Sequence, residues 1–193
     1  IVAQAKDFDL AVLHTSVPSF KSDIATIEAL KAANPNLKVG LIGAKVAVEA
    51  DKSLEQAPIV DFVARNEFDF TIKDVADGKP WSSIQGLSWR NAQGVITHNE
   101  DRPMIEDMDS LPWVTPIYQR DLQIEKYFIG YLKHPYISIY SGRGCKSRCT
   151  FCLWPQTVGG HRYRTRSVGH VVDELVWAKR NFPEVKEFFF DDD

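Results

Sequence analysis

The first 78 residues alternate short apolar runs with amphipathic segments. Continuous apolar runs predict buried strands at 8–17, 37–44 and 59–65. Apolar residues at helical spacing predict helices at 19–35, 45–57 and 67–78. This alternation predicts a parallel sheet covered on both faces, a doubly wound, Rossmann-like α/β domain over residues 1–80. Ligands of such domains bind at the carboxyl ends of the strands, here 14–18, 43–45 and 65–69.

A different pattern follows this domain. Two β-like runs within 86–99, joined through Asn91–Gly94, predict a hairpin, and the proline-containing stretch 106–116 is typical of a linker. We therefore assign 81–135 to hairpin and linker. From residue 136 a strand (136–142), a helix (167–182, with Ser167 as N-cap) and a strand (185–193) predict a second α/β domain. One such unit cannot close a sheet, so we expect the chain to stop inside this domain.

Composition and charge narrow the class of protein. The chain has 193 residues, 44% of them hydrophobic and 25% charged, and the net charge is −3. These values predict a soluble cytoplasmic protein without a signal peptide or transmembrane segment, and they give no indication of nucleic-acid binding. Between Glu125 and Asp173 the sequence holds eight basic and no acidic residues. That stretch is either a solvated basic loop or a pocket for an anionic ligand.

All three cysteines lie inside this basic stretch, at positions 145, 149 and 152. An odd number of cysteines so close together is a poor framework for disulfides, and it indicates a metal or redox site. A structural zinc site needs four ligands, and His161 is a fourth candidate at an uncommon spacing. Three thiolates on an iron–sulfur cubane would leave one iron open to a ligand from outside the protein. An electron-transfer loop and a zinc-stapled binding module therefore remain alternatives to an enzyme.

The motif Cys145-x3-Cys149-Thr-Phe151-Cys152, after a strand and before a helix, resembles that of radical S-adenosylmethionine (SAM) enzymes. The resemblance implies a [4Fe–4S] cluster on the three cysteines, SAM on the fourth iron and a 5′-deoxyadenosyl radical as the product of SAM cleavage. It also implies that 136–193 is the start of a partial TIM barrel, which ends after its second strand. Phe151 would lie near the SAM adenine, or else plug the core under the loop. Asp192–Asp193 would hold the SAM amino group, or else form a polar strand end.

The layout resembles the B12-binding (cobalamin-dependent) branch of this family. Ser16-Val17-Pro18 approaches the Ser-x-Leu motif of cobalamin domains, and Gly43-Ala44 approaches their Gly-Gly motif. Asn66-Glu67-Phe68-Asp69 approaches a Gly-Glu-x-Glu turn of relatives. The resemblance implies cobalamin as a further cofactor, with Ser16 and Gly43 among its contacts. The motif that supplies an axial histidine is missing, and we interpret His14 as a loop or core residue.

Within the branch, the segment 145–167 most resembles the radical SAM proteins of hopanoid biosynthesis. This implies a role in forming the cyclitol ether head group of a hopanoid lipid; the alternative is methyl transfer from methylcobalamin. The implied partners are a small-molecule or lipid-linked sugar substrate and an external electron donor such as flavodoxin or ferredoxin, with peripheral membrane association left open. The basic residues of 161–167 would contact the SAM carboxylate or substrate hydroxyls, or else form a surface loop.

Overall fold

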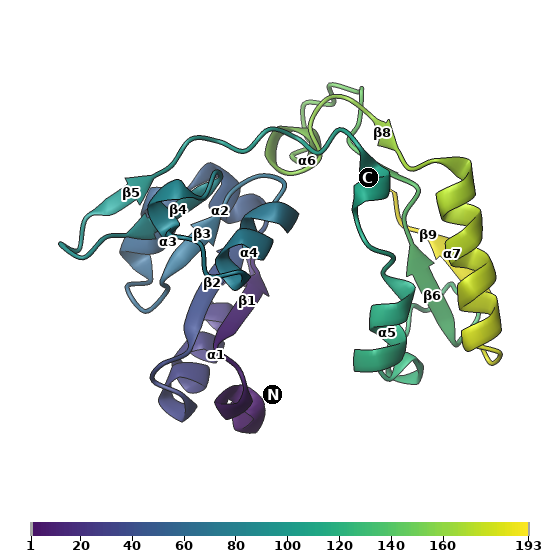
Figure 1. The fold of residues 1–193 in the computed structure, drawn as a ribbon, viewed down its shortest axis with the longest axis horizontal. Coiled ribbons are helices and arrows are strands. Elements are labelled where there is room, and N and C mark those ends of the chain that lie inside the picture. Colours follow the sequence, from purple (N-terminus) through teal and green to yellow (C-terminus); the bar gives the residue numbers. More distant parts are fainter. Residues whose placement is uncertain (1, 193) are drawn as a thin grey trace. The chain divides into compact units, whose positions relative to one another are not determined.

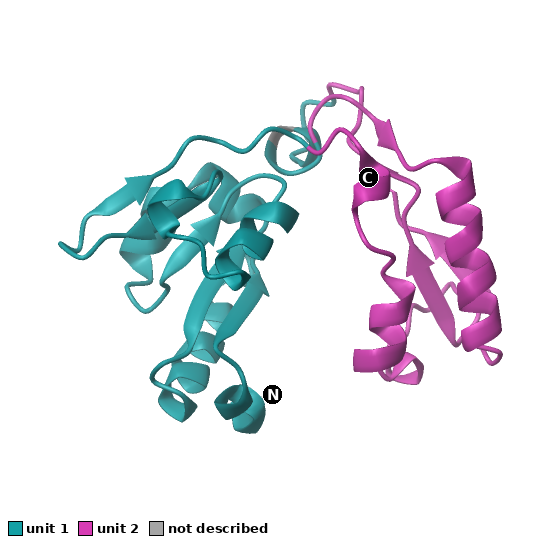
Figure 2. Cartoon of the chain, viewed as in Figure 1, with its two compact units in different colours: residues 1–104, 149–159 teal, residues 105–148, 160–193 magenta. Residues whose placement is uncertain are grey.

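The computed structural model describes residues 2–192 and divides into two compact units. Unit 1 comprises residues 1–104 and 149–159, and unit 2 comprises residues 105–148 and 160–193 (Figure 2). The segment that holds two of the three cysteines therefore belongs to unit 1, although it lies in the second half of the sequence. Within residues 2–192, no helix combines the length and the apolar character that crossing a membrane requires.

Unit 1 is built on a five-stranded sheet in the order β1-β2-β3-β4-β5 (Figure 1). The first three strands are parallel, and the last two are antiparallel. The strands are β1 (Leu10–His14), β2 (Lys38–Ile42), β3 (Phe62–Ala64), β4 (Leu87–Arg90) and β5 (Ile96–His98). Each parallel strand lies within a run that the apolar pattern predicts, so the predicted parallel sheet is confirmed.

Helices cover both faces of this sheet. Successive side chains of a strand point to opposite faces, and Leu41 of β2 accordingly joins one buried cluster while Phe62 of β3 joins the other. Ile27 and Leu54, from the helices that follow β1 and β2, complete the first cluster, and Val75 belongs to the second. The helical elements of unit 1 are η1 (Val2–Asp7), α1 (Phe20–Ala33), α2 (Ala44–Val48), α3 (Ala50–Gln56), α4 (Asp69–Ala76), η2 (Trp81–Ser83) and α6 (Trp154–Thr157). The doubly wound arrangement is therefore confirmed.

Gly40 of β2 lies opposite Phe62 of β3 in the parallel register, and the Phe62 ring occupies the space above it. A Cβ atom at position 40 would lie 2.2 Å from this fully buried ring. We expect Gly40→Ala to lower the free energy of unfolding by about 1–3 kcal/mol, because the ring must leave its packed position. Urea denaturation measures the effect, with Gly130→Ala as the control because its Cβ would meet no atom within 4 Å. Equal midpoints for the two variants would contradict this prediction.

The hairpin belongs to unit 1, which extends that unit beyond the predicted boundary at residue 80. β4 pairs with the open edge of β3, and β5 pairs with β4. Arg65 also ties the hairpin down, because its guanidinium donates to Ser88 Oγ and to the Asn99 carbonyl oxygen. An unpaired edge would leave the buried amides of β3 without partners, which explains why the hairpin completes the sheet.

Unit 2 contains the predicted strand–helix–strand unit. β6 (Tyr136–Ile139) and β9 (Glu187–Phe190) pair in parallel, and α7 (Val168–Asn181) connects them in the sequence. Ser167 caps α7 as predicted, since its side chain accepts a hydrogen bond from the His170 amide at 3.2 Å. Its other elements are η3 (Met108–Ser110), α5 (Thr115–Asp121), η4 (Ile124–Lys126), β7 (Gly142–Arg143) and β8 (Arg164–Thr165). No closed barrel forms among the described residues.

Part of the predicted linker is ordered structure of unit 2. Pro116 stands in the first turn of α5, where its missing N–H would have no helical partner. Tyr118 of α5 and Ile124 of η4 pack into the core of Ile137 and Ile139. Pro116 therefore lies in the first turn of a helix and does not mark a linker.

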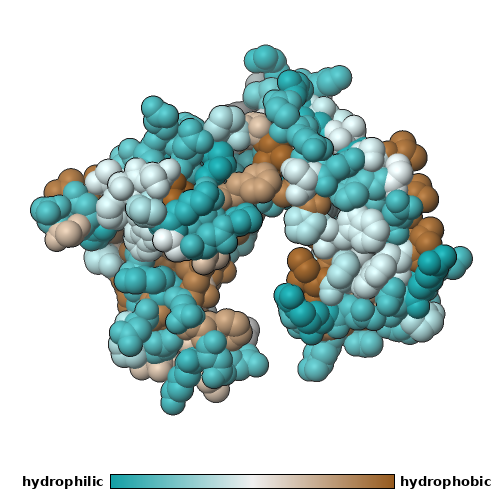
Figure 3. All heavy atoms as spheres, viewed as in Figure 1, coloured by the Kyte–Doolittle hydropathy of each residue, from teal (hydrophilic) through white to brown (hydrophobic). Residues whose placement is uncertain are grey.

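Helical spacing predicts an apolar face of Val171, Leu175 and Val176 on α7, with Trp177 beside it, and the structure leaves Val176 of that face exposed. Val171 and Ala178 face the core of unit 2. Val168, Val172 and Val176, which follow one another at four-residue intervals, are exposed. Figure 3 shows apolar side chains, in brown, over this helix.

Candidate cofactor site

The cysteine loop has a fixed base in unit 2. β7 and β8 pair in antiparallel fashion, Gly142 opposite Thr165 and Arg143 opposite Arg164. Beyond this ladder, the Cys145 amide donates to the Gly160 carbonyl oxygen at 3.1 Å. The loop therefore leaves and rejoins the unit through a short two-stranded ladder.

The structure places the three cysteines in two units. Cys145 belongs to unit 2 and is half-buried, whereas Cys149 and Cys152 belong to unit 1. The last two share a turn, because the Cys152 amide donates to the Cys149 carbonyl oxygen at 3.1 Å. All three thiols are outside any disulfide. Within residues 2–192, no three His, Cys, Asp or Glu side chains converge as a metal-binding group, so ligation by the three cysteines stays a prediction.

Phe151 lies in the turn between Cys149 and Cys152, and 88% of its surface is exposed. It therefore does not plug a core under the loop in this structure. Its predicted role as a SAM contact requires an accessible ring, and the ring is accessible.

A pocket of about 470 Å³ opens in unit 1 at the carboxyl ends of β1 and β2. Its walls come from the loop after β1, from α2 and the residue after it, and from the segment that follows the cysteines. The lining residues are Ser16, Val17, Pro18, Ala44, Lys45, Val48, Glu49, Leu153 and Thr157. This is the edge at which parallel sheets bind ligands. Two of the three predicted strand-end segments line it; the third, 65–69, is absent from its described lining.

The pocket is mostly apolar, with one buried cation in its wall. The Lys45 side chain is 8% exposed, and its ammonium lies 3.1 Å from a Glu49 carboxylate oxygen. The same ammonium lies 4.5 Å from the centre of the Phe20 ring, a cation–π contact. Hydrogen bonds from Lys52 and Lys45 hold the pKa of Glu49 below its usual range, so this carboxylate is ionised at neutral pH.

The backbone at this edge depends on glycine at position 43. Gly43 has φ +109°, and a Cβ atom there would lie 2.5 Å from the Thr15 carbonyl oxygen and 3.0 Å from the His14 ring. Ser16, the other predicted cobalamin contact, lines the pocket and pairs with the Ser19 hydroxyl at 2.9 Å. Asn66, two residues after β3, also has a positive φ of +56°, which asparagine tolerates well.

The acidic end of β9 contacts the start of the cysteine loop. Asp192 accepts hydrogen bonds from the Ser141 amide and hydroxyl at 2.6 and 2.5 Å. Asp193, its predicted partner in SAM binding, lies outside the described residues. The predicted SAM contacts at this strand end are therefore untested.

Two of the basic residues after the cysteines are interior residues of unit 2. Arg164 donates to the Ile105 carbonyl oxygen at 2.6 Å, and Arg166 donates to the Tyr140 carbonyl oxygen at 2.7 Å. Arg166 also forms an ion pair with Glu174. Both arginines are 5% exposed. The alternating basic pattern thus serves the fold of the loop base at these two positions.

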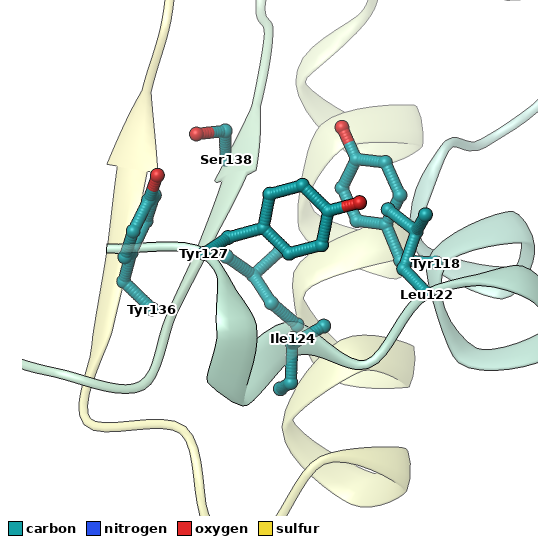
Figure 4. A pocket seen from close by; sticks show the side chains of 7 residues that line it. Tyr118, Leu122, Ile124, Tyr127, Tyr136 and Ser138 are labelled. Carbon is teal, nitrogen blue, oxygen red and sulfur yellow. The ribbon is translucent and has the colours of Figure 1, made fainter. Parts of the chain in front are cut away.

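A cavity of about 210 Å³ in unit 2 contains none of the predicted site residues. Tyr118, Tyr127 and Tyr136 surround it, with Ser138 at one side (Figure 4). Burial, reinforced by the charge of Glu174, raises the pKa of Tyr118, so its hydroxyl is a neutral donor. Sequence spacing does not reveal this cavity, because its walls come from α5, η4 and β6.

Comparison with known proteins gives relatives of more than one kind, among them methyltransferases and tRNA-2-methylthio-N(6)-dimethylallyladenosine synthases. No family model matches the chain. It is 29% identical over 194 residues to an uncharacterized methyltransferase of Pyrococcus horikoshii, a match that covers 97% of this chain and 40% of the relative. The chain thus spans about two fifths of the length of this relative.

Two solved structures share its fold. One is the radical SAM methyltransferase TsrM of Kitasatospora setae, with cobalamin and a [4Fe–4S] cluster bound; the TM-score is 0.66 at 13% identity, over 99% of this chain and 39% of that one. The other is the cobalamin-dependent SAM radical enzyme OxsB, with aqua-cobalamin and SAM bound; the TM-score is 0.71 at 16% identity, over 98% of this chain and 26% of that one. Nearly the whole chain therefore has the fold of a part of each of these enzymes.

Proposed function

We propose that this chain is part of a cobalamin-dependent radical SAM methyltransferase. One observation carries the proposal: the pocket at the carboxyl ends of β1 and β2 is also walled by Leu153 and Thr157, which directly follow the cysteine motif. A ligand held on the sheet edge would therefore lie next to the segment that carries Cys149 and Cys152. The fold shared with TsrM and OxsB supports the same conclusion.

The donor chemistry fits the proposed cofactors. Three cysteines in one loop, none of them in a disulfide, suit an iron–sulfur cluster with one iron open to SAM. When bound, the cluster, SAM and cobalamin would supply a radical and a methyl group. The pocket walls at Val17, Val48 and Leu153 would exclude water from a bound corrin ring. Gly43 would let the backbone turn beneath the ligand, and Lys45 would present a positive charge to it.

Methyl transfer is the reaction that the relatives favour. The Pyrococcus relative and TsrM are both named methyltransferases, whereas these relatives give no support for a hopanoid head group. The hopanoid role, the lipid-linked sugar substrate and the flavodoxin or ferredoxin donor remain predictions from the sequence.

The experiment uses the full-length protein, reconstituted anaerobically with iron, sulfide and hydroxocobalamin. We expect about four irons per chain and one cobalamin, and formation of S-adenosylhomocysteine from SAM under reducing conditions. S-adenosylhomocysteine is the product that remains when SAM gives up its methyl group. Formation of 5′-deoxyadenosine without S-adenosylhomocysteine would instead indicate rearrangement, and stoichiometric zinc without iron would contradict the radical SAM proposal.

Gly43→Ala tests the proposed cobalamin pocket. The added methyl group would clash with the Thr15 carbonyl oxygen, and alanine at position 43 would have to adopt a positive φ that it rarely adopts. Strain of about 1–3 kcal/mol at the site predicts roughly 5- to 150-fold weakening of hydroxocobalamin binding, measured by absorbance titration. Gly78→Ala is the matched control, because Gly78 has φ +74° but its Cβ would meet no atom within 4 Å. Similar affinities for the two variants would place the ligand elsewhere.

A further inference from the structure

Asp192 stands directly after β9 and contacts residues at both ends of the cysteine loop. Its Oδ1 accepts from the Ser141 amide at 2.6 Å and from the Gly142 amide at 3.2 Å. Its Oδ2 accepts from the Ser141 hydroxyl at 2.5 Å and from the Tyr163 hydroxyl at 3.3 Å. Ser141 and Gly142 precede the cysteines, and Tyr163 follows them, so one carboxylate links the two ends. All four residues belong to unit 2.

The protein itself occupies the acceptor capacity of this carboxylate. An ionised carboxylate offers about four acceptor positions, two on each oxygen. Four donors of the chain fill them, and the two shortest bonds have the lengths of charge-assisted hydrogen bonds. A SAM ammonium would have to displace one of these donors in order to bind Asp192.

We propose that Asp192 is a positioning residue that fixes both ends of the cysteine loop, and so orients the cluster ligands, instead of contacting SAM. The proposal rests on the proposed function, because it assigns the loop a cluster to orient. It changes the role that the sequence resemblance implies for this aspartate.

The surrounding contacts leave the loop base little freedom. The Ser141 carbonyl oxygen accepts from the Arg166 amide at 2.8 Å, so the backbone of Ser141 is held from two sides. Gly142 packs so closely that a Cβ atom would lie 2.6 Å from the Arg164 carbonyl oxygen and 2.9 Å from the Tyr163 hydroxyl. Only three residues separate Ser141 from Cys145 along the chain. Movement at Asp192 would therefore pass directly to the first thiolate.

The test compares Asp192→Ala and Tyr163→Phe in the reconstituted full-length protein, with Asp191→Ala as the matched control. The signal is the electron paramagnetic resonance spectrum of the reduced cluster before SAM is added. We expect Asp192→Ala to shift and broaden this spectrum, Tyr163→Phe to give a smaller change of the same kind, and Asp191→Ala to match the parent. The double variant should resemble Asp192→Ala, because both changes disrupt one network.

A direct SAM contact predicts a different result. Asp192→Ala would then leave the SAM-free spectrum unchanged and weaken SAM binding by about tenfold or more, the loss expected for a charged hydrogen bond. Tyr163→Phe would match the parent protein. This outcome would overturn the proposal.

Hydrogen exchange separates failure of this proposal from failure of the proposed function. In cluster-free protein, Asp192→Ala should speed exchange of the Ser141 and Gly142 amides by about tenfold or more, because both lose their acceptor. If the parent protein binds no iron, the proposed function fails, but the exchange rates still test whether Asp192 holds the Ser141 and Gly142 amides. Unchanged exchange at both amides, with native circular dichroism, would overturn the positioning role.

Discussion

Replacing Cys145, Cys149 or Cys152 singly by alanine should reduce the iron of the reconstituted full-length protein from about four per chain to less than about one. Each thiolate is predicted to hold one iron, and a cubane held by two protein ligands is open to solvent on two corners. Loss of a residue that only hydrogen-bonds to a metal ligand typically lowers metal affinity or activity by about 10–100-fold. Loss of a ligand itself should therefore lower product formation by at least about 100-fold. Iron analysis and the visible absorbance that bleaches with dithionite measure the effect.

Two control variants make this result specific. Ser147→Ala changes the same loop between Cys145 and Cys149 but removes no predicted ligand, and it should retain full iron. His161→Ala separates iron from zinc, because His161 is the fourth ligand only in the zinc alternative. Loss of bound metal in His161→Ala would favour a zinc site, and full iron in any one cysteine variant would remove that cysteine from the ligand set.

The order of strands and helices could be predicted because each element carries its own periodicity. β1, β2 and β3 lie within short apolar runs, and α1 and α7 lie within segments of helical spacing. The predicted helix at 45–57 is instead two helices, α2 and α3, which meet at Glu49. Apolar spacing continues across that residue, so the pattern alone does not indicate the break.

Contacts between segments far apart in the sequence could not be predicted from local sequence patterns. Nothing local about Leu153 or Thr157 indicates that they wall a pocket with Ser16 and Ala44. The same holds for Asp192, which the sequence predicts as a SAM contact or a polar strand end, but which binds Ser141, some fifty positions earlier. The motif identifies chemical groups, whereas the tertiary fold decides which of them meet.

The buried pair of Arg166 and Glu174 provides the second large expected effect. The two side chains are 1% and 0% exposed, and Arg166 Nη2 lies 2.6 Å from Glu174 Oε2. Glu174 Oε1 accepts from the Thr115 amide and hydroxyl, both at 3.1 Å. This carboxylate therefore joins α7 to the start of α5, and Arg166 joins both to the Tyr140 carbonyl oxygen at the end of β6.

Glu174→Ala should destabilise unit 2 by about 3–5 kcal/mol, because it leaves the Arg166 charge buried without its partner and removes the acceptor of Thr115. Replacing Arg166 by methionine as well should recover part of this loss, since a pair of apolar residues carries no unpaired charge. Urea denaturation of the full-length protein measures the free energy, and hydrogen exchange at the Thr115 amide localises the change to α5. Glu184→Ala, an exposed acid of the same unit, is the control and should change stability by less than about 0.5 kcal/mol. A double variant as unstable as the sum of the two single variants would show that the ion pair is not what couples these two residues.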